Sequence, residues 1–283
     1  MSDGAPDQLK AWIGRTESRS DVVTAWPAAA LAATLDRRDP EPKPGAALPP
    51  GWHWLYFLEA ASASDLGPDG HPKRGGFLPP VELPRRMWAG GRLEFKHPLR
   101  VGEEIRRESR IASVESKRGR SGNLVFVTVR HTVSAGGELA VVEDHDIVYR
   151  EAPKPGESPP PPKPAPREAS WRRELVADPV MLFRYSALTF IGQRIHYDLE
   201  YCRKVEGYPG LVVHGPLQVI LLLDLARRQE TRPVKRIEYR ALHPLFHFER
   251  FTVNGNPAQN GLQAELWTAN PAGNYAMAAT AYF

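Results

Sequence analysis

Two pairs of segments alternate apolar and polar residues, and each pair predicts a β-hairpin. In the first pair, Leu124–Val133 and Leu139–Tyr149 flank a turn of sequence SAGGE. In the second pair, Leu262–Ala269 and Tyr275–Phe283 flank a turn of sequence NPAGN. β-Branched and aromatic residues alternate with polar ones, and Gly, Pro and Asn mark the turns. Each half of the chain is therefore expected to finish in a strand pair.

A run of apolar residues in the C-terminal half predicts a buried helix over Pro216–Arg228. Proline at the first position and arginines in the last turn are typical helix ends. Only Gln218 and Asp224 interrupt its apolar surface, which predicts a helix wrapped in a sheet. The shorter segment Trp52–Ala60 is the expected counterpart in the N-terminal half, with its aromatic residues in the core.

A proline-rich stretch divides the chain just past its midpoint. Residues 152–166 contain eight prolines in fifteen positions, which predicts an extended polyproline spacer because proline fixes φ and lacks an N–H group. We expect one domain over residues 1–151 and a second over 167–283. The tripeptide His-Pro-Leu occurs at 97–99 and again at 243–245, before strand-like segments, and this repeat favours an internal duplication.

Composition narrows the class of protein. The chain has 283 residues, 42% hydrophobic and 25% charged, which is typical of a globular protein. Its single cysteine, Cys202, excludes an internal disulfide and suits a reducing compartment. A net charge of +4 is weak support for nucleic-acid binding. No apolar run reaches the ~20 residues of a membrane span, and Met1–Lys10 lacks the apolar core of a signal peptide. We therefore expect a cytoplasmic protein.

The densest group of chemically useful residues lies in Phe183–Leu217, which contains His196, Asp198 and the pair His214-Gly215. Gly215 begins the predicted buried helix, where backbone N–H groups are free and the helix dipole is positive. Glycine also lets a substrate approach the backbone closely. A histidine facing this point would be a general acid or base. Together these groups fit a reaction that develops enolate charge on a thioester carbonyl.

These residues resemble those of a known family, the MaoC-like hotdog hydratases. The resemblance is greatest to the double-hotdog group that includes type 2 hydroxyacyl-thioester dehydratases and mesaconyl-, itaconyl- and methylfumaryl-CoA hydratases. Its motifs match at 183–190, 194–198 and 206–217, and in the N-terminal half at Pro84–Gly91 with Phe95 and Pro98. The resemblance implies an α+β double hotdog, two curved antiparallel sheets each wrapped around a helix. The N-terminal hotdog would be a non-catalytic, dehydratase-like domain.

The resemblance implies a hydro-lyase that adds water reversibly to an enoyl-CoA or an enoyl acyl-carrier thioester. It implies no cofactor or metal beyond the thioester carrier, and a small-molecule substrate as partner, with a homodimer as one assembly. By position, His196 would be the catalytic histidine, the Gly215 amide would hold the thioester oxygen, and Gln193 would orient a water or carbonyl. Asp198 would be a structural residue that fixes a loop or strand end. The residues expected to contact substrate are Arg194, Tyr208, Val213 and His214.

Two positions depart from the family pattern. The wider family has Asp five residues and Asn three residues before the histidine, and the closer group tends to have Asn and His there. This chain has Ile191 and Gln193. Ile191 cannot move a proton and Gln193 cannot act as a base at neutral pH, so His196 would manage both proton steps unless another residue joins it. A degenerate hotdog that binds acyl thioesters without catalysis, and a thioesterase, are therefore alternative functions.

Several residues also have plainer interpretations. His196 could be a hydrogen-bonded core histidine, and His214 a cap or packing residue. The acidic cluster Glu143–Asp146 is a poor metal site, because alternate strand positions point to opposite faces. The basic runs Arg203-Lys204 and Arg232–Arg236 are expected on the surface, with the phosphates of coenzyme A as the alternative partner. Cys202 has no neighbouring base and is expected to be a buried, inert thiol.

Overall fold

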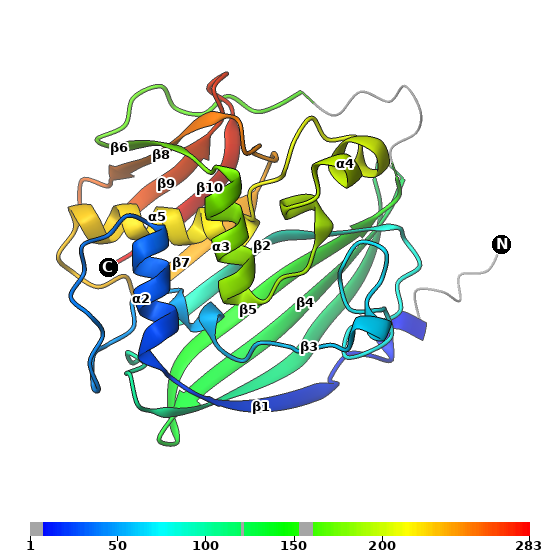
Figure 1. The fold of residues 1–283 in the computed structure, drawn as a ribbon, viewed down its shortest axis with the longest axis horizontal. Helices are drawn as coiled ribbons and strands as arrows, with labels where there is room; N and C mark the ends of the chain where they lie inside the picture. Colours follow the sequence, from blue (N-terminus) through cyan, green and yellow to red (C-terminus); the bar gives the residue numbers. More distant parts are fainter. Residues whose placement is uncertain (1–7, 120–121, 153–160) are drawn as a thin grey trace.

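Ten antiparallel strands form one continuous sheet in the computed structural model, which describes residues 8–119, 122–152 and 161–283 (Figure 1). Five neighbouring strands come from each half of the chain. In sheet order the N-terminal strands are β1 (Thr16–Val22), β3 (Glu104–Gly119), β4 (Gly122–Ala135), β5 (Glu138–Arg150) and β2 (Arg85–Phe95). The C-terminal strands follow as β7 (Arg236–Ala241), β10 (Tyr275–Tyr282), β9 (Gln263–Ala269), β8 (Arg250–Pro257) and β6 (Trp171–Val176). Both predicted hairpins are confirmed, as β4–β5 and β9–β10.

The two halves meet where β2 pairs with β7 in antiparallel register, with Gly90 opposite Arg240 and Gly91 opposite Tyr239. A Cβ atom on Gly91 would collide with the Tyr239 hydroxyl and with the carbonyl of Asp144. Glycine therefore allows the Tyr239 side chain to cross β2 at this junction. The junction makes the sheet continuous from one half to the other.

The two His-Pro-Leu sequences end the central strands β2 and β7 in the same way. In each half, the histidine N–H donates to an alanine carbonyl near the start of the neighbouring hairpin strand. In each half, the leucine carbonyl then accepts a backbone hydrogen bond from a segment earlier in the chain. The matching pairs are His97 N–Ala140 O (3.3 Å) and His243 N–Ala276 O (3.1 Å), and Leu48 N–Leu99 O (2.7 Å) and Val213 N–Leu245 O (2.8 Å). The sequence repeat therefore corresponds to a repeated structure.

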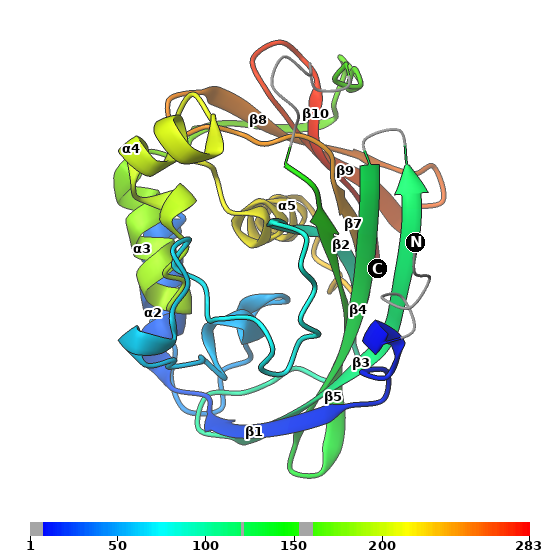
Figure 2. The same ribbon diagram turned by 90° about the vertical axis from the view of Figure 1, so that its right-hand side faces the viewer.

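The predicted C-terminal helix is confirmed as α5 (Gly215–Gln229), which extends one residue further at each end. Figure 2 views α5 nearly along its axis, with the sheet curving around it. Ten consecutive residues of the helix, Leu217–Ala226, are buried. The apolar surface of α5 is buried on all sides, as its sequence pattern predicted. No helix within the described ranges is long and apolar enough to cross a membrane.

The prediction of a helix over Trp52–Ala60 was wrong. Only Trp52–Leu55 forms a single 3₁₀ turn, labelled η1, and Tyr56 is already extended. The Phe57 N–H donates to the Asp21 carboxylate at 2.7 Å, so tertiary contacts use a donor that a helix would need. The aromatic residues are nonetheless in the core, because Trp52, Leu55, Tyr56 and Phe57 are buried. Among the described residues, segment 52–60 therefore supplies no long helix inside the sheet of the N-terminal half.

Two helices that the hydrophobic pattern did not indicate lie side by side on the open face of the sheet (Figures 1 and 2). They are α2 (Ala25–Thr34) and α3 (Pro179–Thr189). α2 is rich in alanine, the residue with the highest helix propensity, and its Pro27 lies in the first turn, where proline is tolerated. Asp178 is the N-cap of α3, and its side chain accepts the Met181 N–H at 2.8 Å.

A polar cluster and aromatic rings occupy the interior of the N-terminal half. Glu143 is buried, and it accepts a hydrogen bond from Trp54 Nε1 (3.1 Å) and lies 3.3 Å from His53 Nε2. Burial opposes ionisation of Glu143, but the bond with His53 and the charges of His131, His53 and His145 together outweigh it and lower the Glu143 pKa to about 2. Asp144 and Asp146 point the other way and pair with Arg92. The side chains of residues 143–146 therefore alternate between the two faces of β5, which is unfavourable for a shared metal site.

The expected linker, residues 152–166, falls largely outside the described part of the chain, because 153–160 are not described. Its last residues lie against the turn between β9 and β10. Pro164 forms a bridge with Asn274, and the Ala165 N–H donates to the Gly273 carbonyl at 2.9 Å. The domain boundaries at 151 and 167 stay predictions.

Asp224 of α5 bonds to three arginines, of which Arg37 belongs to the N-terminal half. Its side chain is 2% exposed and accepts hydrogen bonds from Arg37, from Arg173 (2.7 Å) and from Arg228 (2.8 Å). Arg37 follows α2 and Arg173 lies in β6, so one carboxylate joins three elements. Removing a buried charge leaves its partners uncompensated.

We expect Asp224→Ala to lower the free energy of unfolding by about 2–4 kcal/mol, because three partly buried guanidinium groups would lose their shared carboxylate. Denaturant titration measures this difference. Glu174→Ala is the control, since Glu174 pairs with Arg250 on the surface and should contribute less than about 1 kcal/mol. Equal losses in the two variants would contradict a structural role for the buried carboxylate.

Candidate active site

His196 ends a short 3₁₀ turn, η3 (Arg194–His196), between α3 and the one-turn helix α4 (Leu199–Tyr201). Its Nδ1 atom lies 2.7 Å from the Val212 carbonyl oxygen. A carbonyl only accepts, so Nδ1 carries the proton and Nε2 keeps a lone pair. The residue is 6% exposed. The structure thus holds a buried imidazole in the tautomer that can accept a proton or a hydrogen bond at Nε2.

The His196 ring stacks on the His214 ring, with centroids 3.6 Å apart and planes 17° from parallel. His214 immediately precedes α5, so His196 lies against the N-terminal end of that helix. Ser186 of α3 lies 2.8 Å from His214 Nε2. The His214 side chain makes no capping bond and is fully buried, which agrees with a packing role and not with a side-chain cap.

Gly215 is the first residue of α5, and no hydrogen bond among the described residues uses its N–H group. Such a group at a helix N-terminus is a donor for an oxygen that becomes negative. A Cβ on Gly215 would collide with the Trp88 ring, which comes from β2 of the N-terminal half. The close approach of Trp88 is therefore the structural reason for glycine at this position.

Burial determines the charge state of both stacked histidines. It lowers the His196 pKa to about 4, although the bond to Val212 opposes this, and the charge of His71 lowers it further. Burial also moves the His214 pKa well below its usual value, and His196 adds to the effect. Both rings are neutral at neutral pH. A neutral imidazole can act as an acceptor, but this environment strongly disfavours its imidazolium form.

Gln193 and Arg194, also predicted for the site, build the turn that carries His196. The Gln193 carbonyl accepts the His196 N–H at 3.2 Å, and its side-chain amide has no partner among the described residues. Arg194 pairs with Asp198 at 2.7 Å and donates to the Pro68 carbonyl at 3.1 Å. Asp198 accepts the Tyr201 N–H at 2.9 Å and so caps α4, which confirms its expected structural role.

Of the other predicted contacts, Val213 adjoins His214 in the chain and is buried. The Tyr208 ring packs between Phe246, at 5.9 Å, and the guanidinium of Arg85, also at 5.9 Å. Among the described residues, no hydrogen bond or ring contact joins Tyr208 to His196. The two basic runs have local acidic partners: Lys204 pairs with Glu200, Arg232 with Glu230, and Arg236 with Glu238.

Buried polar atoms without hydrogen-bond partners gather around the start of α5. Tyr185 stacks edge-on against His214 at 5.0 Å, and Trp88 lies 4.9 Å from Tyr239. Four of the eight buried side-chain atoms that lack partners among the described residues lie here: Trp88 Nε1, Tyr185 OH, His214 Nδ1 and Tyr239 OH. Native proteins rarely leave such atoms unsatisfied, so their concentration here indicates groups that a ligand would satisfy.

Three functional candidates were missed by sequence analysis. Trp88 and Tyr185 lie inside matched motifs, but nothing local indicated that they meet at α5. The third is His71, which hydrogen-bonds to Asp69 at 3.0 Å in a loop that contacts Gly192 and Arg194. The sequence around His71, Pro-Asp-Gly-His-Pro, reads only as a turn. The contact between this loop and residues 192–194 joins segments more than a hundred residues apart, so no local sequence pattern predicts it.

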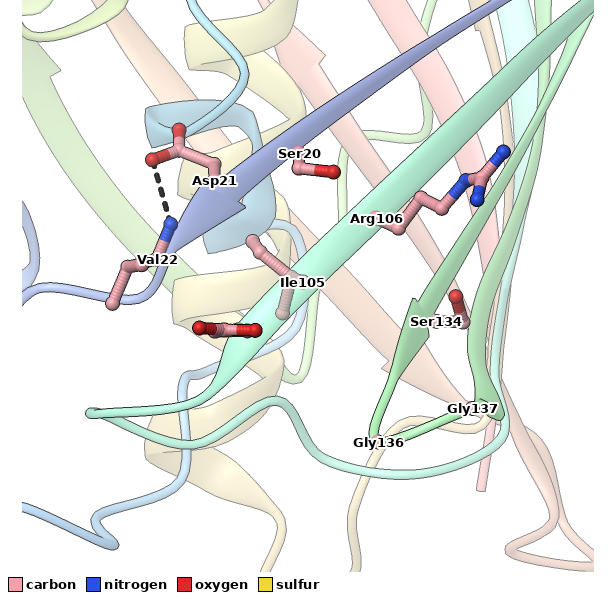
Figure 3. A pocket seen from close by; sticks show the side chains of 9 residues that line it. Ser20, Asp21, Val22, Ile105, Arg106, Ser134, Gly136 and Gly137 are labelled. Carbon is pink, nitrogen blue, oxygen red and sulfur yellow. Dashed lines mark hydrogen bonds between the residues drawn. The ribbon is translucent and has the colours of Figure 1, made fainter.

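A pocket of about 590 Å³ lies between β1, β3 and the β4–β5 turn, and Figure 3 shows the side chains that line it. Its lining includes Asp21, which accepts the Val22 N–H at 2.7 Å, Arg106, Ser134, and the turn residues Gly136 and Gly137. None of the residues at the start of α5 lines it. This cavity is therefore separate from the candidate active site, where His196 and His214 are shielded from solvent.

Comparison with known proteins gives matches over nearly the whole chain. The family model for hydroxyacyl-thioester dehydratase type 2 matches residues 51–247. A mesaconyl-C(4)-CoA hydratase of Chloroflexus aurantiacus is 47% identical over 270 residues, 95% of this chain and 96% of that protein.

Solved structures match the fold. A MaoC-like dehydratase superposes with a TM-score of 0.72 at 13% identity, over 97% of this chain and 99% of its own. A Mycobacterium tuberculosis protein described as a double hotdog has a TM-score of 0.59 at 14% identity, over 98% of this chain and 97% of its own. These similarities confirm the predicted α+β double-hotdog fold.

Proposed function

The chain belongs to the hydroxyacyl-thioester dehydratase type 2 family, and from that premise we propose that it hydrates an enoyl-CoA reversibly, with a mesaconyl-type acyl group as substrate. One observation carries the proposal. His196, with a free Nε2 atom, is stacked on the residue that precedes the unbonded Gly215 N–H. A water acceptor and an oxyanion donor thus lie at the same end of α5.

In the hydration direction, the Gly215 N–H holds the thioester oxygen and His196 Nε2 accepts a hydrogen bond from the attacking water. The water oxygen bonds to the β-carbon, and the π electrons move toward the carbonyl to form an enolate. The positive end of the α5 dipole stabilises the enolate oxygen. One proton leaves the water for an imidazole and one proton reaches the α-carbon, so the net change is addition of one water. Dehydration reverses these steps.

The buried donors around α5 support an acyl group with a polar end. A mesaconyl thioester carries a second carboxyl group besides the thioester carbonyl. Tyr239 OH, Tyr185 OH and Trp88 Nε1 are donors without partners in this part of the core. An acyl group with hydrogen-bond acceptors would satisfy them, whereas an alkyl chain would leave them unpaired. A CoA thioester substrate also suits the cytoplasm that we propose for this chain.

We expect mesaconyl-C4-CoA to lose its conjugated absorbance when the protein is added, with kcat/KM at least about tenfold above that for crotonyl-CoA, since the latter leaves the buried donors unpaired. Absorbance and free thiol are recorded together. Release of thiol without hydration would support a thioesterase instead. Thermal stabilisation by the thioester with neither signal would support the binding-only alternative.

A further inference from the structure

A loop of the N-terminal half docks on the turn that carries His196. The Asp69 carbonyl accepts the Arg194 N–H at 2.9 Å, and the Pro68 carbonyl accepts from the Arg194 side chain at 3.1 Å. Gly70 has φ of +84° and lies so close to Gly192 that a Cβ atom would overlap the Gly192 carbonyl oxygen. Both the backbone conformation and the contact require glycine here. The loop is thus fixed against residues 192–194, the segment that includes Gln193.

This loop brings an imidazole with its own carboxylate. His71 Nδ1 lies 3.0 Å from Asp69 Oδ2, and the His71 backbone N–H donates to Asp69 Oδ1 at 3.1 Å. Burial opposes ionisation of Asp69, but its bonds with His71 outweigh this and lower the Asp69 pKa to about 2. An ionised carboxylate accepts a hydrogen bond from Nδ1–H, so His71 keeps its Nε2 lone pair free, the arrangement found in Asp–His pairs that move protons.

The two imidazoles differ in their ability to carry a positive charge. His196 bonds to the neutral Val212 carbonyl and is 6% exposed. His71 bonds to a carboxylate, and its side chain is 25% exposed. An imidazolium next to a carboxylate and partly in water is more stable than one buried beside a carbonyl. The loop that carries His71 contacts Gly192 and Arg194, next to and within the turn that ends at His196, and the charge of His71 lowers the His196 pKa.

We propose that His71, held by Asp69, is the second acid–base group of this active site and supplies the proton chemistry that Ile191 and Gln193 cannot. As the water oxygen bonds to the β-carbon, His71 Nε2 takes the water proton and becomes an imidazolium stabilised by Asp69. It then gives that proton to the α-carbon as the enolate collapses, and returns to its neutral form. His196 Nε2 orients the water. This inference rests on the proposed hydration.

The pH dependence follows from the groups that face His71. Burial lowers the His71 pKa, the Asp69 carboxylate raises it, and Arg86 and Arg74 lower it. His71 must be neutral to accept a proton, so kcat falls as the pH decreases through the His71 pKa. Without the Asp69 charge that pKa would be lower, and the acid limb of the kcat profile would move to lower pH.

The test combines two variants with chemical rescue, measured by loss of mesaconyl-C4-CoA absorbance. We expect His71→Ala to lower kcat by about 10²–10³-fold with an unchanged melting temperature, and added imidazole to restore part of that activity. Asp69→Asn should lower the plateau of kcat and shift its acid limb to lower pH. His97→Ala is the matched control, because His97 is an exposed loop histidine of the same half.

Two results would overturn the inference while the proposed function stands. In the first, wild-type protein hydrates the thioester and His71→Ala retains its kcat within about twofold, well short of the loss expected for a missing acid–base group. In the second, kcat falls but imidazole restores nothing and Asp69→Asn leaves the pH profile unchanged, which is the behaviour of a structural residue. If the wild-type protein hydrates no thioester, the proposed function fails first and the role of His71 fails with it.

Discussion

Replacing His196 with asparagine is expected to lower kcat for hydration by about 10²–10³-fold with little change in stability. The asparagine amide can donate to the Val212 carbonyl as Nδ1 does, so the turn should keep its shape. It has no group that reaches the position of Nε2, so the attacking water loses its acceptor. Steady-state kinetics, with thermal melting as a check on folding, measures the two effects separately.

His243→Asn is the matched control for this experiment. The Nδ1 atom of His243 also lies near a backbone carbonyl, that of Pro244 at 2.9 Å, but the residue is outside the candidate site. Its replacement should leave kcat unchanged. If His196→Asn keeps the wild-type kcat, His196 is only a hydrogen-bonded core histidine, and the proposed role of its Nε2 atom is wrong.

Gly215→Ala should have the second large effect, a loss of about 10²-fold in kcat/KM together with a stability loss of about 1–3 kcal/mol. The added methyl group meets the Trp88 ring, so either the ring or the first turn of α5 must move. Both lie where the thioester oxygen would bind. Kinetics and denaturant unfolding of the same preparation measure the two losses.

Two further variants determine whether the collision causes these losses. Gly76→Ala is the control, because a Cβ there meets nothing within 4 Å and should change neither quantity. In a Gly215→Ala background, Trp88→Leu removes most of the obstructing ring and should recover part of the lost stability. If stability does not recover, the close approach of Trp88 is not the reason for glycine at 215.

The elements predicted correctly are those whose pattern is local. The β4–β5 and β9–β10 hairpins combine alternation with turn residues, and α5 combines an apolar run with typical ends. The segment Trp52–Ala60 failed because residues apolar at nearly every position fit a helix or an irregular buried segment equally well. The bond from Phe57 to Asp21, 36 residues away, decided the outcome.

The same division applies to the active site. His196 and Gly215 could be found from one short motif, because both lie within twenty residues of the chain. The neighbours that shape their chemistry come from the other half: Trp88 from β2 restricts Gly215, and the loop with Asp69 and His71 contacts Gly192 and Arg194. Such contacts depend on how the halves pack, and no spacing within the sequence encodes them.

The β2–β7 junction has a consequence for how many thioesters one polypeptide can process. Two identical subunits related by symmetry would have equal interiors and therefore paired reaction centres. Here the halves belong to one polypeptide and differ: one encloses α5, and the other encloses the aromatic and acidic side chains around Glu143. Within the described residues, only the former combines a helix start with an adjoining histidine pair. If the proposed site is the place of binding, we expect one acyl-CoA per polypeptide, irrespective of how many copies assemble.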